Sequence, residues 1–413
     1  MKDLQKLKDH FQAFTKSGIV TPDNNEFRKE AFERFCKKGF PNIKQEHWKY
    51  SPLSKDLLKI DEFKFEKTTD TSINKSAFEQ FDHYKIILKD GILISEDCNE
   101  QGLKIIQNKP RIFCEIVKNP ILDFNNAFFT SGFEILVKQN QEISKPVVIY
   151  NIFSKSFNGN NINIKNNITV EANAKLEVYE KNIFEKDEFI FFTKNLEIDL
   201  KDGAKLNKYY LNSTTKNKTI YNLVKANLAK DSQFEKFNFS HNVSSCRDEI
   251  IIDLNGKNSF ASLNNIQHLS DKCYHEIKWE VNHNEENTRS SQFVKSALHD
   301  EAVAAFQGKI YVDSKAQKTD GYQLSRALLL SDQSKFLSKP ELEIYADDVK
   351  CSHGSSSGSI DSDSIFYLRS RGISEQDAKR MMIQGFLNEV IDKVQNKTIK
   401  EIFLNKLNEI NQY

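Results

Sequence analysis

A cysteine and a histidine stand two residues apart in DDVKCSHGSSSG, at residues 347–358. In an extended strand, residues i and i+2 point to the same face, about 6.6 Å apart at their α-carbons. A thiolate at Cys351 and an imidazole at His353 could therefore reach one metal ion or one iron–sulfur cluster. Such sites need about four protein ligands, or three and an open position. Nothing nearby in the sequence supplies the remainder, so the pair predicts either half of a site that another surface completes or no site.

Two other interpretations of this pair stay open. A histidine beside a cysteine can lower the pKa of the thiol and hold a thiolate nucleophile, although no third group or pocket is visible in the sequence. The pair can also be a buried cysteine and a polar histidine that only pack at the corner of a domain. Strand parity does not show which face of the strand looks inward, because Leu342 and Ile344 stand in one phase, whereas Val349 stands in the phase of Cys351 and His353.

A second C-x-H pair shows how little this spacing specifies. Cys273 and His275 lie in CYHEIKWEV, in phase with Ile277 and Trp279, which predicts core positions. The chain has no C-x-x-C, so neither a disulfide framework nor a self-contained zinc or iron–sulfur site is expected. Most of the six cysteines should be reduced packing residues: Cys36, Cys98, Cys114, Cys246, Cys273 and Cys351. The histidines His47, His83, His241 and His299 are isolated in the sequence and are expected at the surface or in the core.

The charge balance and the missing motifs exclude several function classes. Lys and Arg total 59 against 58 acidic residues, so the net charge of +1 provides no field that would gather nucleic acid or an anionic membrane. Neither G-x-x-x-x-G-K-[ST] nor G-x-G-x-x-G occurs, so no intrinsic nucleotide cofactor is expected. No stretch approaches the roughly 20 apolar residues that a bilayer requires, and residues 1–18 predict an amphipathic helix instead of a signal peptide. We expect a cytoplasmic protein.

The elements that must position Cys351 and His353 are short strands over residues 130–360, rich in Val, Ile, Phe and Tyr. Apolar segments such as DEIIIDL, EIKWEVN and GKIYVD begin at intervals of about 13 to 15 residues, with Asp, Asn, Gly or Ser at the breaks. Sandwiches usually show turn signals every 8 to 12 residues, so this longer repeat predicts a β-helix with about 27 residues per two-strand rung. The open ends of such a solenoid must be capped or paired with another chain.

Helical patterns flank this core. The region 1–129 is predicted to be mixed and mainly helical, with the first helix closed by Gly18 and Pro22. Within the connector FPNIKQEHWKYSPL, Trp48 is expected to pack in a core or docking surface. The region 361–413 predicts helices that begin near Asp361, Ser374 and Thr398. These helices must dock on the solenoid or on a partner. Members of the predicted apolar stripes include Leu4, Leu7, Phe11, Phe14, Met382, Phe386, Val390, Ile402, Phe403 and Leu407.

The C-terminal part of the chain resembles the SufB/SufD family, which contains subunits of the Suf iron–sulfur cluster assembly complex. The resemblance is carried by residues 339–391, which contain ADDVKCSHG, a string of the SufD type. Two further stretches support it, QKTDGYQLSRALLLS at 317–331 and FPNIKQEHWKY at 40–50. One departure is visible after CSHG, where Ser355 and Ser356 replace the usual Ala-Thr.

The resemblance implies a mainly β fold, with a right-handed parallel β-helix core flanked by helical N- and C-terminal regions. It also implies a non-catalytic subunit that pairs with a SufB-like subunit and carries a SufC-like ATPase on residues 361–413, with ATP hydrolysis in SufC. A transient iron–sulfur cluster would be shared with SufB, with His353 as a ligand and Cys351 as a nearby contributor. The solenoid edge would also allow a homodimer when SufB is absent.

A β-helix carbohydrate-active enzyme that cleaves acidic polysaccharide is the alternative from another class. Such an enzyme needs carboxylates or basic residues gathered on one exposed face of a sheet. Asp347 and Asp348 are adjacent, so in a strand they would face opposite ways. A groove lined by clustered Asp and Arg on the solenoid wall would support this alternative.

Overall fold

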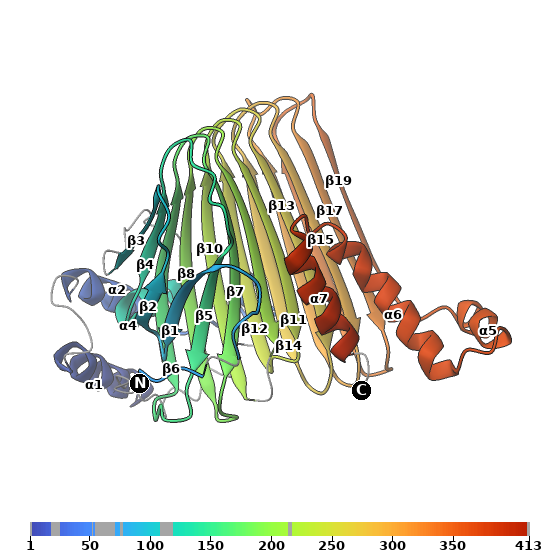
Figure 1. Cartoon of the computed structure of the whole chain (residues 1–413), viewed down its shortest axis with the longest axis horizontal. Coiled ribbons are helices and arrows are strands. Elements are labelled where there is room, and N and C mark those ends of the chain that lie inside the picture. The colour runs from blue at the N-terminus through green and yellow to red at the C-terminus, as the bar shows by residue number, and fades with distance from the viewer. Residues whose placement is uncertain are drawn as a thin grey trace.

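The computed structural model describes residues 2–17, 25–51, 53, 71–74, 77–107, 119–213 and 217–410. Most of them form a solenoid of parallel strands that wind between two sheets (Figure 1). The first sheet has the order β19 (Lys350–Gly358), β17 (Asp320–Leu329), β15 (Arg289–Leu298), β13 (Phe260–Leu269), β11 (Gln233–His241), β9 (Lys205–Ser213), β7 (Lys175–Phe184), β5 (Val147–Phe153), β1 (Tyr84–Lys89) and β2 (Ile92–Asp97). The second has the order β18 (Lys335–Ile344), β16 (Val303–Val312), β14 (Tyr274–His283), β12 (Ser245–Leu254), β10 (Lys218–Leu228), β8 (Ile190–Leu200), β6 (Asn161–Val170), β4 (Phe133–Val137) and β3 (Leu103–Gln107). Gly18, Pro22, Cys114 and the side chain of Leu4 lie outside the described residues.

Successive strands from β4 to β19 alternate between the two sheets, so two strands complete one rung. Equivalent residues on neighbouring rungs are close to the predicted repeat apart. The amide of Asn255, for example, donates to Asn227 Oδ1 at 2.6 Å, and the two residues are 28 positions apart. The predicted parallel β-solenoid with helices at both ends is confirmed. Its first sheet begins earlier than expected, because β1 pairs in parallel with β5, although β1 lies within the region 1–129 that was predicted to be mainly helical.

Asparagine and aspartate occupy the corners between rungs. Asp231, Asn258 and Asn287 have φ angles of 57°, 63° and 58°, in the left-handed region that these residues tolerate better than most. Their side chains also link rungs, since Asn258 Nδ2 donates to Asp231 Oδ1 at 2.8 Å. The polar breaks that set the sequence repeat are therefore the turns of the solenoid.

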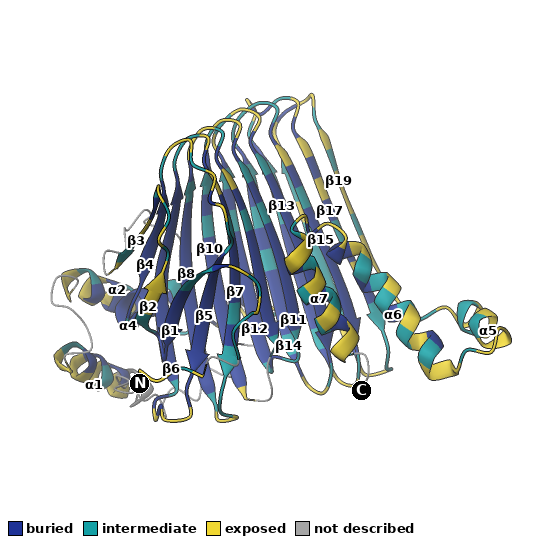
Figure 2. Ribbon diagram, in the orientation of Figure 1, coloured by how far each residue is buried: buried dark blue, intermediate teal, exposed yellow. Residues whose placement is uncertain are grey.

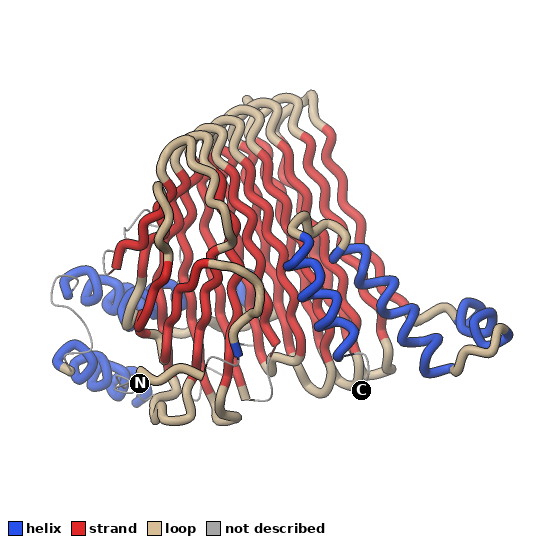
Figure 3. The backbone as a smooth tube through the Cα atoms, viewed as in Figure 1, coloured by secondary structure: helices blue, strands red, loops and turns tan. Residues whose placement is uncertain are grey.

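The three largest clusters of buried apolar residues lie inside the solenoid and on the outer face of each sheet, and two smaller ones lie near the last rungs. Figure 2 shows that the strands are mostly buried, whereas the turns are more exposed. The outer face of the second sheet is covered by α1 (Lys2–Lys16), α2 (Asn25–Lys38) and α4 (Pro120–Phe128). The outer face of the first sheet is covered by α6 (Glu375–Ile391) and α7 (Lys397–Ile410). In Figure 3 these helices lie against the strands at the two ends of the chain.

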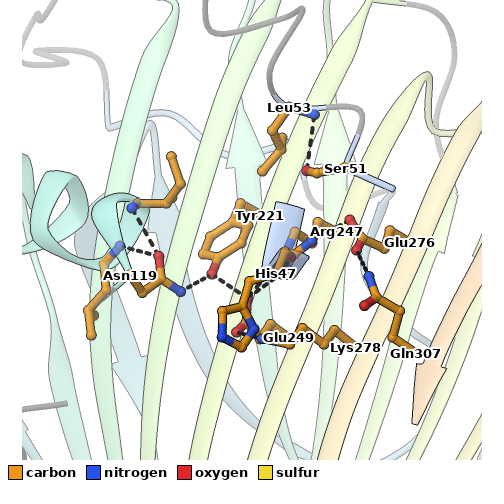
Figure 4. A network of polar contacts seen from close by, with 12 residues as sticks. His47, Ser51, Leu53, Asn119, Tyr221, Arg247, Glu249, Glu276, Lys278 and Gln307 are labelled. Atoms are coloured by element: carbon orange, nitrogen blue, oxygen red, sulfur yellow. Dashed lines mark hydrogen bonds and ion pairs between the residues drawn. The ribbon is translucent and has the colours of Figure 1, made fainter. Parts of the chain in front are cut away.

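The connector before residue 53 is anchored on the second sheet through a buried ionic network (Figure 4). Its short helix η2 (Glu46–Trp48) places the Trp48 ring 4.1 Å from the guanidinium carbon of Arg247. Arg247 also donates to the carbonyl oxygen of His47 at 3.0 Å and forms ion pairs with Glu249 and Glu276. Trp48 is buried, so its predicted packing role is confirmed.

The C-terminal helices follow the predicted boundaries with one exception. Asp361 caps α5 (Ser362–Ser370), and the Ser374 hydroxyl accepts from the backbone N–H of Asp377 at 3.1 Å at the start of α6. The prediction that Thr398 begins the last helix was wrong. Asn396 caps it instead, because its side-chain oxygen accepts from the N–H of Ile399 at 3.1 Å. In the part of the chain that the structure describes, no helix is long and apolar enough to cross a bilayer.

Candidate functional site at the open end of the solenoid

The solenoid ends in two strands, each with one neighbour. β18 is the last strand of one sheet and β19 is the last strand of the other. The outer edge of such a strand presents unpaired N–H and C=O groups that can accept another strand. Large apolar side chains near this end reach solvent, including Tyr345, which is 59% exposed, and Tyr322, which is 41% exposed. We call β18 and β19 together the solenoid rim.

The structure settles the parity that the sequence left open, because His353 continues a column of inward-facing side chains. His353 on β19 is in register with Gln323 on β17, which is in register with Gln292 on β15. The column continues to Leu263, which is fully buried in the solenoid core. His353 therefore points to the interior side of its strand. It is exposed because no further rung covers it.

Cys351 lies on the same side of β19 and is only half-buried. It follows Gly321 in register, and its Sγ is 3.5 Å from the position of a β-carbon built on that glycine. The thiol packs against a small cluster that includes Ile310 and Val312. Burial raises the pKa of Cys351, with a smaller coulombic contribution from Asp320 in the same direction. This direction is opposite to the one that a thiolate nucleophile needs.

The pair remains an incomplete ligand set within this chain. Cys351 and His353 share one face of one strand, as the i, i+2 spacing predicted. Among the residues that the structure describes, no group of three or more His, Cys, Asp and Glu side chains could hold a metal ion. An imidazole and a thiolate at an open rim suit iron, provided that another surface supplies the other ligands.

The other C-x-H pair is buried, as predicted. Cys273 and His275 have almost no exposed surface, and a ring nitrogen of His275 lies 2.7 Å from the carbonyl oxygen of Val243. Comparing the two pairs shows that position in the solenoid distinguishes Cys351 and His353. The two pairs have the same residue types and spacing, but only Cys351 and His353 lie on the last rung.

Several polar residues near the rim were missed by the sequence analysis. The hydroxyl of Ser325 lies 3.0 Å from Ser338 Oγ and 3.1 Å from Ser355 Oγ, so these three serines join β17, β18 and β19. Gln323 fills the interior directly beneath His353. Counting back one repeat from His353 would have identified Gln323, because equivalent residues on neighbouring rungs recur at a nearly constant interval.

A second polar group lies deep inside the solenoid. Lys194 and Lys208 place their Nζ atoms 2.5 and 2.6 Å from the two carboxylate oxygens of Glu180, and all three side chains are buried. Lys236 pairs with Asp248 at 2.6 Å in the same interior. Burial lowers the pKa of Lys194 to about 8. Each of these groups is ion-paired and closed off from solvent, so they do not offer a reactive surface.

Three histidines that appear isolated in the sequence lie in a row under the C-terminal helices. Successive rings of His241, His268 and His299 are 5.4 and 5.2 Å apart between centroids, beside a cavity of about 830 Å³ between the first sheet, α6 and α7. Burial lowers the pKa of His241 to about 4. The cationic side chains that line this cavity are each in an ion pair with a carboxylate of their own helix: Lys379, Arg380 and Lys406. The sequence analysis did not predict this row of rings, whose planes are tilted by 48° from one to the next.

A second hollow, of about 680 Å³, lies at a solenoid corner next to the rim. Its lining includes Arg289, Asp320, Asp348 and Lys350. This is the mixture of acidic and basic residues that the polysaccharide-cleaving alternative requires. The lining residues belong to turns and strand ends instead of one flat sheet face.

The α5 helix offers a different kind of surface. None of its residues is buried, and Figure 1 shows it projecting beyond the strands at the C-terminal end. Phe366 is 75% exposed and Tyr367 is 55% exposed. By contrast, α6 and α7 bury Leu387 and Phe403 against the first sheet. The sequence left open whether these helices dock on the solenoid or on a partner, and the structure docks α6 and α7 on the solenoid and leaves α5 exposed.

Comparison with known proteins identifies related chains. Residues 153–386, more than half of the chain, match the family described as SUF system FeS cluster assembly, SufBD core domain. The chain is 27% identical over 385 residues to the iron–sulfur cluster assembly protein SufD of Escherichia coli, which covers 91% of this chain and 90% of that protein. It is 27% identical over 236 residues to the chloroplastic protein ABCI7 of Arabidopsis thaliana, covering 57% and 50% of the two chains. It is 42% identical over 105 residues to the SufBD family protein slr0076 of Synechocystis, covering 25% and 23%.

Proposed function

This chain belongs to the SufBD core family of the SUF system for iron–sulfur cluster assembly, and from that premise we propose that it is a non-catalytic scaffold subunit. In this proposal it pairs through the solenoid rim with a SufB-like subunit and binds a SufC-like ATPase through its C-terminal region. A nascent cluster forms between the paired subunits, with His353 as a ligand and Cys351 as a nearby contributor. The observation that carries the proposal is an incomplete ligand pair on an unpaired rim.

The chemistry of the rim supports a shared site. The cluster is cargo that is assembled and passed on, so a half-site that a partner completes can also be opened again. His353 is exposed, so its imidazole can reach a ligand-binding position outside its own chain. Burial raises the pKa of Cys351, so its thiol must lose a proton when it binds iron. We therefore expect the Cys351 thiol to ionise only when iron is bound.

The exposed aromatic surface of α5 supports a second contact. Phe366 and Tyr367 are large apolar groups that monomers usually cover, and such residues are enriched at protein interfaces. We assign this surface to the SufC-like ATPase, whereas α6 and α7 pack on the solenoid and α6 connects α5 to it. The expected location of the assembled complex is the cytoplasm.

Copurification tests the scaffold role. The full chain is expressed with SufB-like and SufC-like proteins from the same organism, and a tag on this chain is used for capture. We expect both partners to be retained. The double variant Phe366→Ala/Tyr367→Ala should lose the ATPase and keep the SufB-like subunit. Failure of the unmodified chain to retain either partner would remove the proposal.

Cluster reconstitution tests the ligand assignment separately. The purified complex is reconstituted with iron and sulfide, and its visible absorbance and iron content are measured. We expect His353→Ala to lose most of the cluster, and Cys351→Ala to lose part of it. Ser352→Ala is the matched control, because Ser352 is exposed on the same strand and points to the opposite side. Equal iron content in His353→Ala and Ser352→Ala would exclude His353 as a ligand.

The polysaccharide-cleaving alternative is less well supported. Within the described residues, its structural support is the mixed lining of the corner hollow with Asp320 and Arg289. Membership of an assembly family favours the scaffold role over this alternative.

A further inference from the structure

Two glutamines occupy equivalent interior positions on the last complete rungs. Gln292 on β15 and Gln323 on β17 are in register and fully buried. Each extends its amide across the interior to the opposite sheet. Gln292 Nε2 donates to the carbonyl oxygen of Lys309 at 3.3 Å, and Gln323 Nε2 lies 3.5 Å from the carbonyl oxygen of Glu341. The two side chains therefore have the same burial and the same type of cross-sheet contact.

The amide oxygens of both glutamines are buried and have no hydrogen-bond partner. A buried acceptor without a donor costs about 1–3 kcal/mol, so such an atom usually has a use or an absent partner. The surroundings of the two oxygens differ on the rim side. Gln292 is followed by Gln323, whereas Gln323 is followed by the imidazole of His353. An imidazole carries a ring N–H that can donate to an amide oxygen.

We propose that Gln323 is a positioning residue for His353. In solution the exposed His353 ring turns so that one ring N–H donates to the unpartnered Oε1 of Gln323, and this directs the other ring nitrogen toward the shared site at the rim. Metal-binding histidines generally donate their second N–H to an oxygen acceptor, which fixes the tautomer and the ring orientation. The proposal deepens the proposed function and rests on it for the identity of the bound iron. The orientation of the ring can be measured without a cluster.

The geometry gives Gln323 two separable roles. Its Nε2 approaches β18 at the carbonyl of Glu341, which holds the two last rungs together. Its Oε1 is buried and has no hydrogen-bond donor in the structure. A leucine at this position would keep the apolar volume and remove both functions, whereas a glutamate would keep an oxygen acceptor and lose the amide donor. Gln292 has the first role alone, which makes it the matched control.

The experiment measures the mobility and environment of the His353 ring in the full chain. Histidine is labelled with ¹³C and ¹⁵N, and the His353 signals are identified by their loss in His353→Ala. At pH 8.5 ordinary imidazoles are neutral, so protonation does not obscure the result. We expect a rigid ring in the unmodified chain and in Gln292→Leu, with an order parameter near about 0.85. In Gln323→Leu we expect a value below about 0.6. Gln323→Glu should restore the rigid ring.

Cobalt binding supplies a second readout. The complex with the SufB-like subunit is titrated with Co²⁺, and the expected loss of affinity is about 10–100-fold for Gln323→Leu. Gln292→Leu should stay within about twofold of the unmodified complex, at a similar melting temperature. Equal ring mobility in Gln323→Leu and Gln292→Leu would overturn the inference, and so would an unchanged ring in Gln323→Leu.

The outcomes separate this inference from the proposed function. If His353→Ala blocks cluster formation while the ring is unaffected by Gln323→Leu, the positioning role fails and the ligand role stands. If the ring becomes mobile in Gln323→Leu while His353→Ala forms clusters normally, the positioning role stands and the ligand role fails.

Discussion

Replacing Arg247 by methionine should destabilise the chain strongly, because this guanidinium compensates buried carboxylates. Arg247 has no exposed surface, and its ion-pair partners Glu249 and Glu276 are buried as well. Lys278 contributes a second ammonium, 3.1 Å from Glu249. Two cations therefore face two carboxylates in the unmodified network. The variant leaves one buried carboxylate without a counter-charge while keeping an unbranched apolar side chain beneath Trp48.

Breaking a buried ion pair by removing one partner typically costs about 3–5 kcal/mol, and we expect a loss of this size at pH 8. Burial already raises the pKa of Glu276 despite the opposing effect of Arg247. Without Arg247 that pKa rises further, so in the variant the folded chain takes up a proton at a higher pH than the unfolded chain does. Stability is then lost as pH rises. The difference in the free energy of unfolding between the unmodified chain and the variant should narrow on acidification by about 1.4 kcal/mol per pH unit. This holds over the range in which Glu276 is protonated in the folded variant but still ionised in the folded unmodified chain.

Urea unfolding at pH 8 and pH 6 measures this gap. Tryptophan fluorescence is suitable because Trp48 lies on the Arg247 guanidinium and the chain contains 2 tryptophans. The second variant Arg247→Met/Glu276→Gln should recover most of the loss, since it removes the uncompensated charge. Lys225→Met is the matched control. Its ion pair with Asp253 is partly exposed and should contribute at most about 1 kcal/mol. A loss below about 1 kcal/mol for Arg247→Met, or a gap that does not change with pH, would refute the reasoning.

Three further predictions concern other parts of the fold. Burial lowers the pKa of His241 and of His275 to about 4 and that of His283 to about 3, whereas unfolded histidine titrates near 6.5. Only the unfolded chain takes up these three protons between pH 6.5 and about 4, so the free energy of unfolding should fall by about 4 kcal/mol per pH unit in that range, and a flat profile in urea titrations would contradict this. Phe403→Ala should cost about 3–5 kcal/mol by removing a ring that lies 4.6 Å from Phe237, and hydrogen exchange should accelerate in α7 but not in the solenoid strands. Asn287→Ala should cost about 1–2 kcal/mol because φ is 58° at this corner, whereas Asn287→Gly should have a melting temperature close to that of the unmodified chain.

The solenoid could be predicted from the sequence because its repeat is local. Each rung contributes two apolar strands and polar corners at a nearly constant interval, and corner residues such as Asn258 carry both the composition signal and the left-handed backbone. The start of the last helix could not be chosen correctly, because Thr398 and Asn396 are both favourable caps and only the backbone direction decides between them. The early strand β1 was missed because it joins the sheet through β5, a pairing with no local signal.

The sequence predicted which residues form the candidate site but not which side of the strand they occupy. The sequence suggested that Cys351 and His353 share a face, but parity around Val349 left the inward side open. The register that links His353 to Leu263, three rungs earlier in the chain, shows that the pair faces inward. Gln323 was not predicted because a buried glutamine in a strand has no chemical motif of its own. The contact between the rings of His241 and His268 was not predicted because the two residues belong to different rungs.

Because the rungs are in register, the solenoid can become longer or shorter by one complete rung at a time. Neighbouring strands are about 4.8 Å apart, so deleting one complete rung would move the C-terminal end that much closer to the N-terminal helices and leave every remaining ladder intact. Deleting a single residue would instead invert one strand, turning its core side chains outward. Homologous chains can therefore differ in reach by multiples of one strand spacing while they present the same terminal surface.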